Sequence, residues 1–82
     1  MATFHQVALS DIENVNYADL ESAKLHALEN SYDSFDYQVN QCSDANAIAL
    51  SKSTNPYEIL NGRHRIYLAR QKGWRTIRAR FA

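Results

Sequence analysis

The chain has 82 residues, of which 45% are hydrophobic, with only two glycines and one proline, a composition that excludes a disordered tail and a second domain. The formal net charge is zero, the lone cysteine Cys42 excludes an internal disulfide, and the three histidines lack the spacing of a zinc site. No apolar run is long enough to span a bilayer, and the first ten residues lack the features of a signal peptide. We therefore expect one cytoplasmic domain over residues 1–82, without membrane contact.

The first expected elements are a strand and a helix. Residues 4–9 alternate between apolar and polar positions, which predicts a half-buried strand with His5 as a core or rim residue. Asn16 has the N-cap role and Asp19 the capping-box role of a helix over residues 17–32. The leucines, alanine and tyrosines of this helix form one broad stripe, which suits a helix laid on a sheet.

Two charged residues, Glu21 and Lys24, fall within that apolar stripe. Either they form an i,i+3 pair at its edge, which is the interpretation we favour, or they point into a polar cleft. In the second case Glu21 is the candidate catalytic carboxylate, as a general base or a metal ligand, because partial burial can raise the pKa of a glutamate towards neutrality.

A polar, acidic segment and a hairpin form the middle of the chain. Residues 31–46 are rich in turn formers with isolated aromatic anchors, and we interpret them as an ordered loop. The hairpin that follows has a strand at residues 47–51, a turn at residues 52–56 and a return strand at residues 57–60.

A glycine turn after the hairpin opens a basic helix. Gly62 breaks the strand, and residues 63–72 predict a helix that ends at Gly73 as its left-handed cap. A helix that begins just after a glycine presents backbone N–H groups and the positive end of its dipole. The side chains around this end are those of Arg63, His64 and Arg65. The sequence therefore predicts a phosphate-binding site here.

The final strand is expected at residues 74–81. The charged residues are unevenly distributed along the chain, although the net charge is zero. All nine acidic residues lie within residues 1–62, whereas the charged side chains of residues 63–82 are all cations. Either these cations pair with the acidic half, or they bind an anionic partner, as their clustering favours. The cations expected to form a nucleic-acid backbone surface are Arg70, Lys72, Arg75, Arg78 and Arg80, with Trp74 as a stacking residue or a core plug.

The C-terminal half of the chain resembles the ParB/sulfiredoxin superfamily, through its order of hairpin, glycine, basic helix, glycine and closing strand and through the text YEILNGRHRIYLARQKGWRTIRARF. The resemblance is strongest over residues 48–81 and weaker over residues 7–32. The positions that match the family signature are residues 57–60, Gly62, the box Arg63-His64-Arg65, Ala69, Gly73 and Ile77. It implies an α+β domain with a small mixed sheet and two or three helices.

The resemblance also implies a ligand. In its members the box after the glycine binds the phosphates of a nucleotide, CTP in partition proteins and ATP in sulfiredoxins and in small-molecule kinases of the same fold. Nucleotide-phosphate binding, of CTP or ATP with Mg²⁺ as a companion, would then fall to Gly62, Arg63, His64 and Arg65. Guanidinium groups and a helix N-terminus also suit phosphate oxygens on chemical grounds.

Departures from the family pattern narrow this expectation. Sulfiredoxins place a catalytic cysteine directly after the glycine, where this chain has Arg63, so sulfiredoxin activity is disfavoured and Cys42 is interpreted as passive. Partition proteins carry an arginine box and a separate operator-reading domain that this chain lacks, so we expect a stand-alone relative from a plasmid, phage or toxin system. A nuclease activity rests on the family name alone, because the acidic residues are spread singly.

Three hypotheses about function follow. The first is a nucleotide-binding module, in which NTP hydrolysis or phosphoryl transfer would need Mg²⁺ and a carboxylate such as Glu21. The second is a module that binds or cleaves DNA through the basic surface. The third is a catalytically inactive adaptor whose acidic loop mimics nucleic acid towards a basic protein partner. The sequence favours binding over catalysis and leaves a homodimer open.

Overall fold

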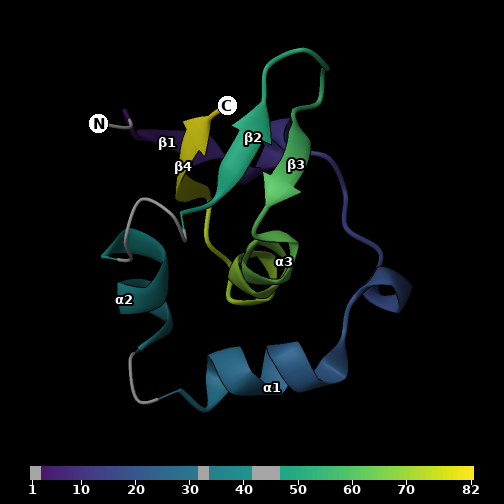
Figure 1. Cartoon of the computed structure of the whole chain (residues 1–82), viewed down its shortest axis with the longest axis vertical. Helices are drawn as coiled ribbons and strands as arrows, with labels where there is room; N and C mark the ends of the chain where they lie inside the picture. Colours follow the sequence, from purple (N-terminus) through teal and green to yellow (C-terminus); the bar gives the residue numbers. More distant parts are fainter. Residues whose placement is uncertain (1–2, 32–33, 42–46) are drawn as a thin grey trace.

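The fold is α+β, with a mixed sheet whose strand order is β1-β4-β2-β3 (Figure 1). This computed structural model describes residues 3–31, 34–41 and 47–82, and within them the sheet has four strands. The strands are β1 (His5–Ala8), β2 (Ala49–Ser51), β3 (Glu58–Asn61) and β4 (Thr76–Phe81). Strand β4 pairs antiparallel with β1 and parallel with β2, and β2 and β3 form the expected antiparallel hairpin.

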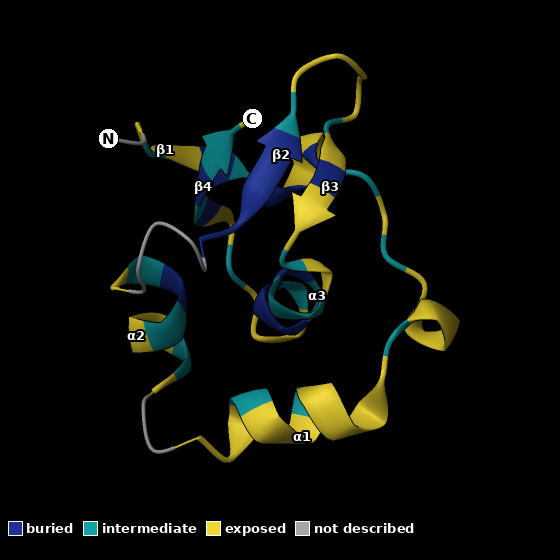
Figure 2. Cartoon of the chain, viewed as in Figure 1, coloured by how far each residue is buried: buried dark blue, intermediate teal, exposed yellow. Residues whose placement is uncertain are grey.

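The core lies between the sheet and helix α3 (Arg63–Gln71), which crosses one face of the sheet. Alternation along β4 buries Ile77 and Ala79, whereas Thr76 is exposed and Arg78 and Arg80 are partly exposed. Ile66 and Ala69 of α3 are completely buried against this face. Figure 2 shows the buried residues concentrated in β2 and on one side of α3.

The helix expected over residues 17–32 is wrong in extent and in position. A 3₁₀ helix, Tyr17–Asp19, is followed by an extended break, and helix α1 (Ser22–Glu29) begins only after Glu21. A continuous helix would direct the Glu21 N–H to the carbonyl of Tyr17. Instead this N–H donates to Nε2 of His64, 3.0 Å away and 43 residues along the chain.

Helix α1 also does not lie on the sheet. It packs on α3, so that α3 separates it from the sheet (Figure 1). All eight residues of α1 are described, and none of them is buried. Leu25 and Leu28 are half-buried, and the other six are exposed. The apolar stripe expected for this helix is therefore largely exposed to solvent (Figure 2).

The ordered loop expected over residues 31–46 contains a helix, α2 (Phe35–Asn40). The hydroxyl of Ser34 accepts the Tyr37 N–H at 3.1 Å, which is an N-cap that the sequence displayed and the loop interpretation overlooked. Val39 anchors this short helix with only 1% of its surface exposed. The segments 32–33 and 42–46, which include Cys42, lie outside the described residues.

The elements after residue 48 agree closely with the sequence. Helix α3 begins after Gly62 and ends before Gly73. Gly73 has the positive φ expected of a left-handed cap, +80°, and Gly62 also has a positive φ, +101°. No helix in the described part of the chain is long and apolar enough to cross a membrane.

Candidate functional site

The turn between β3 and α3 requires glycine for two reasons. Gly62 adopts φ +101°, a conformation that L side chains rarely take. A Cβ at this position would also lie only 2.6 Å from Cγ1 of Ile48. The Gly62 carbonyl accepts the Ile66 N–H at 3.0 Å, which is the first hydrogen bond of α3. The N–H groups of the first two residues of α3, Arg63 and His64, therefore have no carbonyl within the helix to bind.

A pocket of about 370 Å³ opens at this helix start. Its walls come from α1, α2 and the turn that leads into α3, and we call it the helix-start pocket. The residues that line it are Lys24, Ala27, Leu28, Gln38, Asn61, Gly62, Arg63, His64 and Arg65. The structure thus brings together the four residues that the sequence assigned to phosphate binding. Of the described residues in its walls none is acidic and three are cations, so the described lining carries a net positive charge.

His64 links the pocket to α1. Its Nε2 accepts the Glu21 N–H, and an acceptor nitrogen carries no proton, so the neutral ring holds its proton on Nδ1. Burial lowers the pKa of His64 below its ordinary 6.5, the charges of Lys24 and Arg63 lower it further, and Glu21 opposes them. The imidazole is therefore neutral near pH 7 and serves as the capping acceptor of α1.

Two amide side chains fix the pocket walls. Asn61 Nδ2 donates to the carbonyl of Ala47 at 3.1 Å, which holds the end of β3 beside the start of β2. Gln38 Nε2 donates to the carbonyl of Leu28 at 3.0 Å, which ties α2 to the end of α1. The sequence did not single out these amides. It placed Lys24 either in an edge pair with Glu21 or in a polar cleft, and the structure shows Lys24 both paired with Glu21 and lining the pocket. The available signal for this wall was the i,i+3 and i,i+4 spacing of Lys24, Ala27 and Leu28, which places the three side chains on one face of a helix.

Glu21 takes the edge position that we favoured over the polar cleft. Its carboxylate lies 3.8 Å from Nζ of Lys24, and the two side chains are 67% and 62% exposed. The backbone of Glu21 takes part in the site through His64, but its side chain is outside the described lining of the pocket. The partial burial on which a catalytic Glu21 depends is not found.

Arg70, expected on a nucleic-acid surface, is directed inwards. Its guanidinium donates to the carbonyls of Leu9 and Ile12, both at 2.8 Å, and of Glu13 at 3.1 Å. Burial lowers the pKa of this guanidinium, which nevertheless stays charged because arginine is so strongly basic. Arg70 therefore holds the segment that follows β1 against α3, and its donors are used within the protein.

The other predicted nucleic-acid residues are dispersed. Lys72 lies over the ring of Phe35, with 5.4 Å from Nζ to the ring centre, and the guanidinium of Arg78 stacks 3.5 Å from the ring centre of Phe4. Arg75 is exposed and Arg80 is half-buried. Trp74 packs edge-on against Phe35 at 5.1 Å between ring centres, so it is the core plug of the two interpretations.

In the part of the chain that the structure describes, no three His, Cys, Asp or Glu side chains gather where they could hold a metal ion.

Comparisons with known proteins do not supply a family for this chain. No protein-family model matches the sequence, and a search of curated proteins finds no similar one. Assignment of a function therefore depends on the geometry and the charge of the helix-start pocket.

Proposed function

We propose that this protein is a nucleotide-binding domain that holds phosphate groups in the helix-start pocket. The observation that carries the proposal is the convergence of Arg63, Arg65 and Lys24 on the N-terminus of α3, without a carboxylate among the described lining residues. Phosphate oxygens need hydrogen-bond donors and positive charge, and a helix N-terminus with two guanidinium groups supplies both. Gly62 contributes the positive φ with which the chain turns from β3 into the start of α3.

The remaining walls suit the nucleoside part of such a ligand. Ala27 and Leu28 of α1 give the pocket an apolar side, and Gln38 brings an amide to it. A volume of about 370 Å³ lies within the range of small-molecule sites in proteins. The neutral ring of His64 contributes an N–H on Nδ1, since its Nε2 is already hydrogen-bonded.

We also propose that the fold is that of the ParB/sulfiredoxin superfamily. Support comes from the order of elements after residue 48, in which the hairpin, Gly62, α3, Gly73 and β4 follow one another as the resemblance implies. A role in a DNA-associated plasmid, phage or toxin system follows from the resemblance alone.

The proposal is for binding and assigns no reaction. The described walls of the pocket offer cations and amides rather than a carboxylate, so they do not fit a protein-held Mg²⁺. Mg²⁺ would enter only as the companion of the nucleotide phosphates. Glu21, at the surface and paired with Lys24, supplies no general base at this pocket.

A thermal-shift panel of CTP, ATP, GTP and inorganic triphosphate, each with and without Mg²⁺, tests the proposal. A ligand at about one hundred times its Kd stabilises the native state by about 2.7 kcal/mol, which such a scan detects. Arg63→Ala and Arg65→Ala should each reduce the shift, whereas the matched control Arg75→Ala removes an exposed arginine outside the pocket and should preserve it. If none of these ligands raises the melting temperature of the wild-type protein, the proposal is wrong.

The nucleic-acid hypothesis has less support, because Arg70 uses its donors inside the protein and Trp74 is a core residue. A phosphate-backbone interface would show an affinity for DNA that falls steeply as salt is added. We expect the nucleotide to bind in the pocket and DNA to bind only weakly. The substitution Arg80→Ala should leave that weak affinity for DNA unchanged. The adaptor hypothesis relies on an acidic loop that lies partly outside the described residues.

A further inference from the structure

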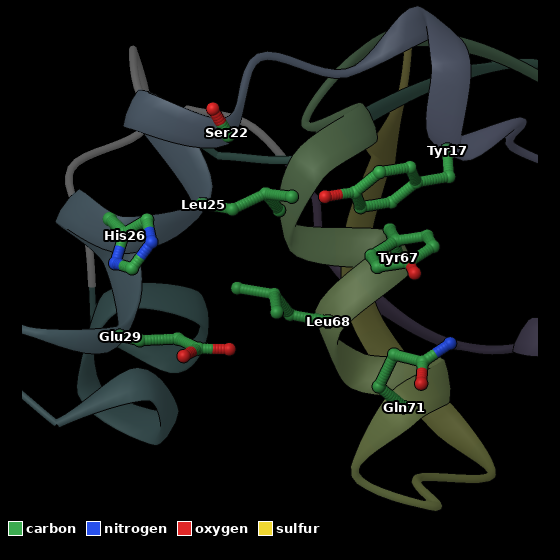
Figure 3. A pocket seen from close by; sticks show the side chains of 8 residues that line it. All are labelled: Tyr17, Ser22, Leu25, His26, Glu29, Tyr67, Leu68 and Gln71. Carbon is green, nitrogen blue, oxygen red and sulfur yellow. The ribbon is translucent and has the colours of Figure 1, made fainter.

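A second pocket, of about 320 Å³, lies between α1, α3 and Tyr17 (Figure 3). The side chains that shape it are Tyr17, Leu25, Glu29, Tyr67, Leu68 and Gln71, and we call it the tyrosine pocket. Among the described residues it shares none with the helix-start pocket. Helical periodicity explains the separation, because Leu25 and Glu29 project from one side of α1 while Lys24 and Leu28 project from the other.

Two tyrosines form an aromatic wall of this pocket. The rings of Tyr17 and Tyr67 lie 5.8 Å apart between centres and are tilted by 49°. Tyr17 is 61% exposed, so little of this ring is used in the core. Figure 3 shows Tyr17 lying over Tyr67, with Leu25 reaching towards them from α1. The pocket therefore presents aromatic surface to a ligand beside the apolar side chains of Leu25 and Leu68.

The charge of this pocket is opposite to that of the helix-start pocket. Its described lining contains the carboxylate of Glu29 and no lysine or arginine. Glu29 is also the last residue of α1, where the helix dipole is negative. His26 is the other titratable side chain beside the tyrosines in the wall. The carboxylate and the helix end together favour a positively charged occupant.

We propose that the tyrosine pocket binds an organic cation, an ammonium or guanidinium group carried on a short apolar stem. Such cations are attracted to the faces of aromatic rings, and they pair with a carboxylate. Leu25 and Leu68 offer apolar contact to the stem, and the amide of Gln71 offers a hydrogen-bond acceptor to an N–H. The cation is either a free small molecule or a lysine or arginine side chain of another protein, because the recognising chemistry is the same.

Amide chemical shifts followed by two-dimensional NMR test this proposal with three probes. Choline represents a free cation, Nα-acetyl-arginine amide represents a protein side chain, and dimethylbutanol is the uncharged carbon isostere of choline. We expect at least one of the two cations to shift Tyr17, Glu29 and Tyr67 in a saturable manner, with the isostere at least several-fold weaker. Tighter binding of the arginine derivative would identify a protein side chain as the source, and tighter binding of choline a free quaternary ammonium compound.

Surface variants provide the control. Glu29→Gln and Tyr17→Leu alter exposed side chains and should each weaken cation binding by about threefold to tenfold. Glu58→Gln removes the same charge from an exposed position in β3 and should leave the affinity unchanged. The proposal is overturned if neither cation shifts these residues, if dimethylbutanol binds as tightly as choline, or if Glu58→Gln weakens binding as much as Glu29→Gln. Nucleotide binding is measured separately, so its failure would not be confused with this one.

Discussion

The two pockets beside α1 share one helix and differ in the sign of their charge. Lys24 projects from α1 into the helix-start pocket, where the N-terminus of α3 and two arginines add positive charge. Glu29 projects into the tyrosine pocket, where the C-terminus of α1 itself adds negative charge. The two sides of α1 thus differ in charge rather than in hydrophobicity. This explains why the apolar stripe expected from the sequence placed the helix wrongly on the sheet.

The largest effect is expected at Gly62, in the turn that opens α3 beside the helix-start pocket. Gly62→Ala combines an unfavourable positive φ with a contact of 2.6 Å to Ile48 and should lower the free energy of unfolding by about 3 kcal/mol. Gly73→Ala is the matched control, because its φ is +80° but its Cβ would meet no described atom within 4 Å. We expect that control to lose only about 1 kcal/mol in urea unfolding. Equal losses would mean that the contact with Ile48 has no role.

Charge reversal on α1 should separate the two pockets. Lys24→Glu places an acid in the helix-start pocket and should weaken nucleotide binding by about tenfold, measured by calorimetry, while cation binding in the tyrosine pocket persists. Glu29→Lys should do the reverse. A loss of both activities in either variant would indicate that α1 had moved as a whole, and would contradict two separate binding sites.

Acid should loosen the connection between α1 and α3. The pKa of His64 in the folded protein is below 6.5, so the unfolded chain binds the proton first as the pH falls. The contribution of His64 to stability is therefore complete above about pH 7 and decreases as the pH falls through 6.5 towards the folded-state pKa. Urea unfolding between about pH 8 and pH 5.5 should show this decline, and His64→Ala should flatten it. His26→Ala, which removes an exposed histidine, is the control and should retain the slope.

The smallest effect is expected at Glu21. Glu21→Gln removes one partner of an exposed ion pair and should change the unfolding free energy by less than about 0.5 kcal/mol. Its backbone hydrogen bond to His64 remains, so nucleotide affinity should hold as well. If the wild-type protein shows turnover and Glu21→Gln loses most of it while nucleotide affinity is unchanged, the Glu21 side chain would have a catalytic role.

Local signals predicted the second half of the fold, and distant contacts decided the first half. Gly62, α3 and Gly73 follow from turn and cap preferences within a few residues, so the sequence located the helix and the residues at its start. The break before α1 depends on His64, 43 residues away, and no local pattern contains it. Arg70 was expected at the surface because its charge was visible in the sequence, whereas the three carbonyls that it satisfies were not.

The shallow attachment of α1 has a further consequence for exchange and cooperativity. With no buried residue among its eight, the described helix should open locally, and its amide protons should exchange with solvent faster than those of α3. A ligand in either pocket would order α1 and so remove part of the entropic cost of filling the other. By thermodynamic reciprocity, each ligand should then raise the affinity of its counterpart by the same factor.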